Sequence, residues 1–416
     1  MSVKTGADMV RTPRSRARTI SVLLGITCTL ATVYAPDAAF ASTSTVPPFS
    51  AGSQEWPLDS GHFDAQRLWA LSTGSGVTVA VVDTGVDASN SDLRAQVLPG
   101  VDLTDEAANG QVDTSADSHG TSVAGVIAGN GDSGGSDGMT GLAPGAKILP
   151  IRIADSSDAV DPTLAAEGIS YAVTHGARII NLSLGATIND PEIRDAVTYA
   201  LAHNVIVVTA VGNNGLSGNQ PMYPASVPGV LAVAGSTQND GVWTQGESGS
   251  YVNLAAPAEN IYSTSDSGGH MTSAGTSYSA PYVSAAAALL WARYPSETSG
   301  QIIARLIDNT DPIGGAHGRT SQSGYGELDP YKALTGPVPA STANPLLTDS
   351  AKPLSAPTST SGGGGSGLSL TIPLSSAGGA IVLAGALSFW WWKRRMKSAP
   401  NTPTATSKPG PKEARR

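Results

Sequence analysis

Cysteine is almost absent from this chain. Among 416 residues the one cysteine is Cys28, close to the N-terminus. A lone thiol cannot form a disulfide within the chain or build a cysteine-ligated metal site. The six histidines show no spacing typical of metal ligands. No metal and no cofactor is therefore expected.

Charge is also sparse. Charged residues make up 14% of the chain, the formal net charge is -9 and the isoelectric point is near 5.1. Basic residues cluster only at the two ends, so no nucleic-acid partner is expected, because such a partner requires a basic surface. Apolar segments of the kind directed to membranes also lie at the two ends.

The N-terminal segment has the features of a secretory signal peptide. Five basic residues between Lys4 and Arg18 precede an uncharged run from Ile20 to Tyr34, and Ala39-Phe40-Ala41 offers a cleavage site. This pattern predicts a signal peptide over residues 1–41. An uncleaved anchor is the alternative, but the run is shorter than the roughly 20 residues that span a bilayer.

Residues 368–392 carry no charge and have the length of one transmembrane helix. The run ends in three tryptophans, Trp390 to Trp392, and Lys393 begins a basic segment at once. Because positive charges favour the cytoplasmic side, residues 393–416 are predicted to form a cytoplasmic tail, with the upstream chain outside the cell membrane. A buried core helix is the other reading of such a run.

Composition divides the rest of the chain. Residues 337–367 are rich in Pro, Ser, Thr and Gly, which predicts a flexible linker. Residues 42–69 form an N-terminal extension that is too short for a folded propeptide domain. One folded body, residues 70–336, lies between them.

Within this body, short apolar runs alternate with helix-like segments. The helix-like segments begin at Pro162 and Pro191, as helices with a proline in the first turn do. The runs predicted as strands cover residues 77–83, 146–153, 177–185, 205–212 and 230–236. Strands apolar on nearly every position suit a parallel sheet covered on both faces. The expected fold is a three-layer α/β sandwich with a mainly parallel sheet, whose ligands bind beyond the carboxyl ends of the strands.

Four segments carry polar side chains that are candidates for this ligand site. Asp83 ends the first strand in VAVVDTG, His119 stands in DSHGTSVAG, Asn213 in AVGNNG, and Ser277 in GTSYSAP before an alanine-rich run. Each has a structural alternative, such as a turn former or a helix cap. Pro281 is expected in the first turn of a helix, which places Ser277 at the helix start.

The four segments, in this order, resemble the signature segments of the subtilisin-like serine proteases. The resemblance implies that Asp83, His119 and Ser277 form a catalytic triad and that Asn213 stabilises the oxyanion. Ser183, Leu184 and Gly185, in NLSLGA, match the strand with which the family binds extended peptide or protein substrates. Met222 stands where many relatives have a glycine beside the primary specificity pocket.

The loop after His119 carries Asp132 and Asp137 among glycines. A calcium site is one reading of this loop, and a flexible surface loop is the simpler one.

The order of signal peptide, short extension, protease, linker, single helix and basic tail resembles the mycosins, the membrane-anchored proteases of type VII secretion systems. This likeness implies an endopeptidase that cuts exported proteins beside the secretion membrane complex. A mainly structural role in that complex is the alternative. Mycosins commonly carry disulfides, whereas this chain has a single cysteine and differs from them in this respect.

Overall fold

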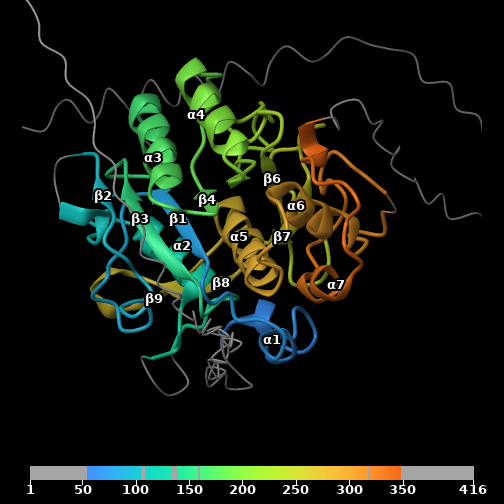
Figure 1. Ribbon diagram of the computed structural model, residues 1–416, viewed down its shortest axis with the longest axis horizontal. Helices are drawn as coiled ribbons and strands as arrows, with labels where there is room; N and C mark the ends of the chain where they lie inside the picture. The colour runs from blue at the N-terminus through green and yellow to red at the C-terminus, as the bar shows by residue number, and fades with distance from the viewer. Residues whose placement is uncertain (1–53, 105–107, 133–137, 158–159, 317, 348–416) are drawn as a thin grey trace, which may run out of the picture. The chain divides into compact units, whose positions relative to one another are not determined.

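The computed structural model describes residues 54–104, 108–132, 138–157, 160–316 and 318–347. Seven strands form one sheet in the order β2-β3-β1-β4-β5-β6-β7, and every neighbouring pair is parallel (Figure 1). The strands of this sheet are β1 Thr78–Asp83, β2 Val101–Asp102, β3 Lys147–Arg152, β4 Ile179–Leu182, β5 Ile206–Ala210, β6 Leu231–Ser236 and β7 Leu254–Pro257. The predicted α/β sandwich with a mainly parallel sheet is confirmed.

The remaining elements are one antiparallel hairpin and the helices. The hairpin consists of β8 Ile261–Thr264 and β9 His270–Ser273. The α-helices are α1 Ala65–Trp69, α2 His119–Ala128, α3 Pro162–Thr174, α4 Pro191–Ala202, α5 Thr276–Arg293, α6 Ser299–Asp308 and α7 Pro330–Thr335. Short 3-10 helices cover η1 Trp56–Leu58, η2 Ala108–Gly110, η3 Asp266–Gly268 and η4 Pro345–Leu347.

The strand order reverses beside β1. From β1 the chain first forms the edge strand β2, returns to β3 beside β1, and then builds β4 to β7 on the other side of β1. In open α/β sheets, ligands bind at such a switch point, outside the carboxyl ends of the strands. Asp83, the last residue of β1, and the segment that follows β4 meet at this switch point.

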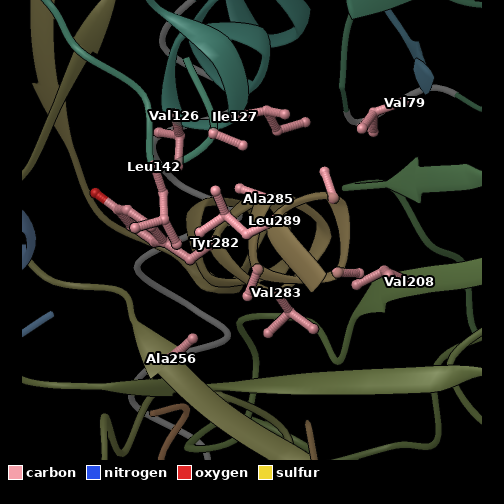
Figure 2. Close-up of a cluster of buried hydrophobic side chains, with 14 of the residues drawn as sticks. Val79, Val126, Ile127, Leu142, Val208, Ala256, Tyr282, Val283, Ala285 and Leu289 are labelled. Atoms are coloured by element: carbon pink, nitrogen blue, oxygen red, sulfur yellow. The ribbon is translucent and has the colours of Figure 1, made fainter. Parts of the chain in front are cut away.

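Helices cover both faces of the sheet (Figure 1). On one face, α3 and α4 lie side by side and bury residues such as Ile169 and Val197 against Ala80 and Val207. On the other face, α2 and α5 pack in a separate core cluster that includes Val79 and Val208 (Figure 2). Apolar contact on both faces explains why the strands read as nearly continuous hydrophobic runs.

Helix α5 is the centre of the second core cluster. Its side chains Tyr282, Val283, Ala285 and Leu289 are surrounded by side chains from α2 and from the sheet (Figure 2). The alanine run is fully or almost fully buried, with Ala286 at 1% and the others at 0% exposure. Small side chains let the helix axis approach the sheet closely, so the alanine-rich sequence suits a buried helix.

Helices α3 and α4 begin as predicted. Pro162 and Pro191 are their first residues. The preceding aspartates cap them: Asp161 accepts a hydrogen bond from the backbone N–H of Thr163, and Asp190 accepts one from that of Glu192. An acidic N-cap satisfies a backbone donor that the helix itself cannot, and it interacts favourably with the helix dipole.

The expectation for Pro281 was wrong. Helix α5 begins at Thr276, so Pro281 is its sixth residue and lies beyond the first turn. Proline has no N–H, and the carbonyl of Ser277, four residues earlier, therefore lacks its helical donor. Ser277 is still at the helix start, as its second residue.

The N-terminal extension is packed onto the body from residue 55 onward. Trp56, Leu58, Phe63 and Trp69 are all at most 8% exposed and belong to the same core cluster as α5. The indole N–H of Trp56 donates to the backbone oxygen of Glu259 at 2.9 Å. Packing and hydrogen bonds thus hold this segment, which contains no cysteine.

The first part of the predicted linker also lies on the body. Gln301 in α6 donates to the carbonyl of Pro339, Asn344 donates to the carbonyl of Gly229, and Leu346 is 4% exposed. The predicted signal peptide, transmembrane segment and cytoplasmic tail lie outside the described residues. Within the described ranges, the helices are too short or too polar to cross a membrane.

Candidate active site

Asp83 and His119 are in direct contact. The Nδ1 atom of His119 lies 2.7 Å from Oδ1 of Asp83. Asp83 ends β1 and is fully buried, whereas His119 is the first residue of α2 and is 6% exposed. The contact fixes the imidazole orientation: Nδ1 donates to the carboxylate, and Nε2 is left to accept a proton.

The surroundings favour the protonated imidazolium of His119. Burial by itself lowers the pKa of His119, but the charge and hydrogen bond of Asp83 outweigh it. The charges of Asp117 and Asp113 act in the same direction, so the pKa of His119 is raised above its ordinary value of 6.5. Such a site stabilises a positive charge that forms on this ring.

Ser277 is at the start of α5, which packs against α2, the helix that begins with His119. The ring of Tyr278, the next residue, is 6.3 Å from the His119 ring, centroid to centroid. The hydroxyl of Ser277 donates to the carbonyl of Ser183 at 3.1 Å. Hydrogen bonds between catalytic groups often tighten only when substrate binds.

A polar chain buried behind Ser277 compensates for Pro281. The carbonyl of Ser277, which has no helical donor, accepts a hydrogen bond of 2.7 Å from the hydroxyl of Ser183. Asn181 Nδ2 donates to that hydroxyl, and Ser284 donates to Asn181 Oδ1, both at 2.9 Å. The segment after β4 and the start of α5 are therefore linked in both directions, through the hydroxyl and the carbonyl of Ser183.

Asn213 follows β5 and faces the same helix start. Its Oδ1 accepts two hydrogen bonds of 2.9 Å, from the backbone N–H and from the hydroxyl of Thr276. Because both donors face the oxygen, the amide orientation is determined, and Nδ2 is the donor end of this amide. The residue Thr276, which holds this amide, was not singled out from the sequence.

Glu247 is a second residue that sequence analysis missed. It is 2% exposed, and its Oε2 accepts a hydrogen bond of 3.1 Å from the backbone N–H of Asn214. Its own N–H donates to the carbonyl of Gly212. Burial raises the pKa of the Glu247 carboxyl. Glu247 therefore supports the loop that presents Asn213.

The predicted substrate segment lies at the edge of the site. Ser183 and Leu184 are each 4% exposed, whereas Gly185 is exposed. An apolar pocket beside them is lined by Leu184, Gly185, Ile193 and Tyr223, among others. Met222 fills the space between two glycines: a β-carbon on Gly212 would lie 2.8 Å from its Cγ, and one on Gly185 3.4 Å from its Cε.

The candidate calcium loop lies partly outside the described residues, since they include Asp132 but not Asp137. Asp132 accepts a hydrogen bond from the side chain of Asn130. In the described part of the chain, no three or more His, Cys, Asp or Glu side chains are grouped so that they could hold a metal ion.

Sequence-predicted residues from five separate segments thus lie at one edge of the sheet. Asp83 contacts His119, Ser183 contacts Ser277, and Asn213 contacts the residue before Ser277. The arrangement offers a hydroxyl, an imidazole with a buried carboxylate behind it, and an amide donor. These groups suit nucleophilic attack on a carbonyl followed by stabilisation of an oxyanion.

The chain is similar to known proteins of one family. The subtilase family model matches residues 74–326. Thermitase of Thermoactinomyces vulgaris is 36% identical over 65% of this chain and 92% of its own length. Mycosin-1 of Mycobacterium tuberculosis is 34% identical over 73% of this chain and 78% of its own length.

Solved structures of mycosins are also similar. MycP1 from the ESX-1 type VII secretion system gives a TM-score of 0.60 at 30% identity, covering 73% of this chain and 91% of the MycP1 chain. MycP3 from the ESX-3 system gives a TM-score of 0.59 at 32% identity, covering 70% of this chain and 91% of its own. The chain belongs to the subtilase family of serine endopeptidases.

Proposed function

We propose that Asp83, His119 and Ser277 form the catalytic triad of this endopeptidase. The observation that carries the proposal is the 2.7 Å contact between His119 Nδ1 and Asp83, beside the start of the helix that bears Ser277. His119 Nε2 takes the proton of the Ser277 hydroxyl as this hydroxyl attacks the scissile carbonyl. Asp83 stabilises the imidazolium, which then protonates the leaving amine.

Asn213 supplies the oxyanion donor. Thr276 holds Oδ1 of Asn213 and so directs Nδ2 to the side where Ser277 attacks. The second donor is the backbone N–H of Ser277, the second residue of α5, where the unsatisfied N–H groups and the helix dipole favour negative charge. Both donors are in place before the reaction, so little reorganisation is required.

Substrate binds as an extended strand along residues 183–185. The exposed backbone of Gly185 pairs with the peptide, and the apolar pocket beside Leu184 takes one apolar side chain. Met222 occupies space beside Gly185 and Gly212, next to the oxyanion donor. Because Met222 takes up this space, the substrate residue just before the scissile bond is small.

The enzyme acts outside the cell membrane on exported proteins. The predicted signal peptide and the predicted membrane segment at residues 368–392 support this location. Similarity to Mycosin-1 and to MycP1 and MycP3 supports an association with a type VII secretion membrane complex.

A serine-directed fluorophosphonate tests the triad. The wild-type protein should be labelled, and the Ser277→Ala variant should not be. Ser279→Ala is the control, because Ser279 is a fully buried serine of the same helix whose hydroxyl donates to Pro257. Equal labelling of the wild-type and Ser277→Ala proteins contradicts the assignment.

A mainly structural role in a secretion complex is the second candidate. The membrane-anchor pattern and the mycosin likeness suit it as well as they suit proteolysis. Cells that carry Ser277→Ala distinguish the two. An uncut exported protein together with an intact complex supports proteolysis as the main role, whereas unchanged processing contradicts it.

A further inference from the structure

Asp113 is a buried carboxylate that the proposed mechanism does not use. It is 5% exposed and precedes His119 by six residues. Its two oxygens accept five hydrogen bonds from three residues. Burial raises the pKa of the Asp113 carboxyl, whereas the hydrogen bonds from Ser115 and Thr121 favour its ionised form, which can accept from all five donors.

These donors come from both sides of the Asp83–His119 contact. On one side, the hydroxyl of Thr84, the residue after Asp83, donates to Oδ1 of Asp113 at 3.1 Å. On the other side, Thr121, two residues after His119, donates to Oδ2 with its backbone N–H at 3.0 Å and its hydroxyl at 2.7 Å. One carboxylate therefore joins the end of β1 to the start of α2.

The same cluster caps α2. Its nominal N-cap residue, Ser118, is in the left-handed region with φ of 50° and makes no capping bond. The first three N–H groups of the helix instead donate to Ser115 Oγ at 3.3 Å, Thr84 Oγ1 at 3.0 Å and Asp113 Oδ2 at 3.0 Å. Ser115 in turn donates to Asp113 at 2.6 Å. Unsatisfied donors at a helix start need such partners, and here one network supplies them.

We propose that Asp113 is a positioning residue that holds His119 against Asp83 by capping α2 and binding Thr84. This inference rests on the proposed triad. The Asp113→Asn variant keeps the shape of the side chain but replaces one acceptor oxygen by an NH2 group. This NH2 group would face hydrogen-bond donors and could not accept from them. The start of α2 would then shift, and His119 would be displaced from Asp83.

Asp113 also contributes to the charge around His119. The groups facing His119 are Asp83 from β1, Asp113 and Asp117 from the preceding loop, Tyr278 from α5, and Asp266 of the hairpin through Ser118. The negative charge of Asp113 favours the imidazolium, so its removal lowers the pH at which His119 loses its proton.

The test is fluorophosphonate labelling of the full chain across pH, with thermal unfolding and the low-field proton resonance of His119 Nδ1–H. For Asp113→Asn we expect labelling about 10- to 100-fold slower and half-maximal labelling at a lower pH than in the wild type. The resonance of the His119 Nδ1–H proton should be shifted or lost. The control is Asp117→Asn, an exposed carboxylate near the same ring. Its half-maximal labelling should also move to lower pH, but its maximal labelling rate at high pH should stay within about twofold of wild type.

If Asp113→Asn does not fold, Ser115→Ala replaces it and should slow labelling about 3- to 10-fold. The proposal is overturned if the variant keeps the wild-type labelling rate, pH of half-maximal labelling and His119 Nδ1–H resonance. It is also overturned if the fraction of unfolded protein fully explains the lost labelling. Labelling of Ser277→Ala, or no labelling of the wild-type protein, instead overturns the proposed triad.

Discussion

The hydroxyl of Ser183 donates a 2.7 Å hydrogen bond to the carbonyl of Ser277, the oxygen that Pro281 leaves without its helical donor. Ser183 follows β4, whereas Ser277 is in α5, so the bond joins residues 94 positions apart. The backbone of the proposed nucleophile is therefore held by the segment after β4, which is also expected to bind substrate.

Replacing Ser183 by Ala should weaken this connection. The Ser277 carbonyl would lose its partner in a partly buried site, so we expect about 1–3 kcal/mol of lost stability. Labelling by fluorophosphonate should fall about 3- to 10-fold. Ser170→Ala in α3 is a matched control, because the Ser170 hydroxyl donates to a carbonyl four residues earlier, in a helix on the opposite face of the sheet. Equal effects of the two variants would contradict the prediction.

Removal of the Asn213 amide should act on the transition state. Asn213→Ala should lower kcat about 100- to 1,000-fold, or about 3–4 kcal/mol, with little change in KM. Thr276→Val keeps the amide but loses the hydroxyl bond to Oδ1, so its kcat should fall less. Steady-state kinetics with a peptide substrate measure both. A Thr276→Val loss as large as that of Asn213→Ala would show that Thr276 does more than orient the amide.

The pH dependence of the reaction should follow His119. The imidazole accepts a proton only when neutral, so labelling should rise with pH and reach half its maximum above pH 6.5, because the folded pKa is raised. The same shift means that protonated His119 stabilises the fold at low pH. This contribution is fully present below the unfolded pKa and is lost as pH rises through the folded value. A midpoint below pH 6.5 would contradict the prediction.

Met222 should limit the size of the substrate residue just before the scissile bond. Met222→Gly would open the space beside Gly185 and Gly212. We expect kcat/KM to rise at least about tenfold for a phenylalanine at that position relative to alanine, because pocket volume decides such preferences. Leu216→Gly, at an exposed position after Asn213, is the control and should leave the ratio unchanged. An unchanged ratio in Met222→Gly would place the pocket elsewhere.

The packed N-terminal segment should contribute to stability. Trp56→Ala removes a side chain that is 8% exposed and leaves the carbonyl of Glu259 without its indole donor. A loss of about 3–5 kcal/mol is expected, measured by urea unfolding in a Ser277→Ala background to prevent self-cleavage. Leu216→Ala, at a residue 76% exposed, should change stability by less than about 0.5 kcal/mol. A comparably small effect of Trp56→Ala would mean that this segment contributes little.

Local sequence was sufficient for the main elements of the fold. Continuous apolar runs predicted five of the seven strands of the sheet, and aspartate followed by proline marks the starts of α3 and α4. The edge strands β2 and β7 and the β8–β9 hairpin were missed. β2 has two residues, so its sequence carries little periodic signal, and β8 and β9 are partly polar, unlike the apolar run that contains the equally short β4.

The sequence by itself determined which residues are candidates for the site, because the four motifs and their order can be read directly from the chain. Only the tertiary structure decided how they are held. Asp113 and Glu247 lie outside the four motifs, and Thr276 lies within GTSYSAP but has no role that the motif reveals. The roles of all three arise from contacts between segments far apart in the chain. Pro281 makes the same point: its missing N–H can be read from the sequence, but the hydroxyl of Ser183 that compensates for it comes from another layer of the fold. Hydrogen bonds between distant segments depend on three-dimensional distance, which residue order alone does not contain.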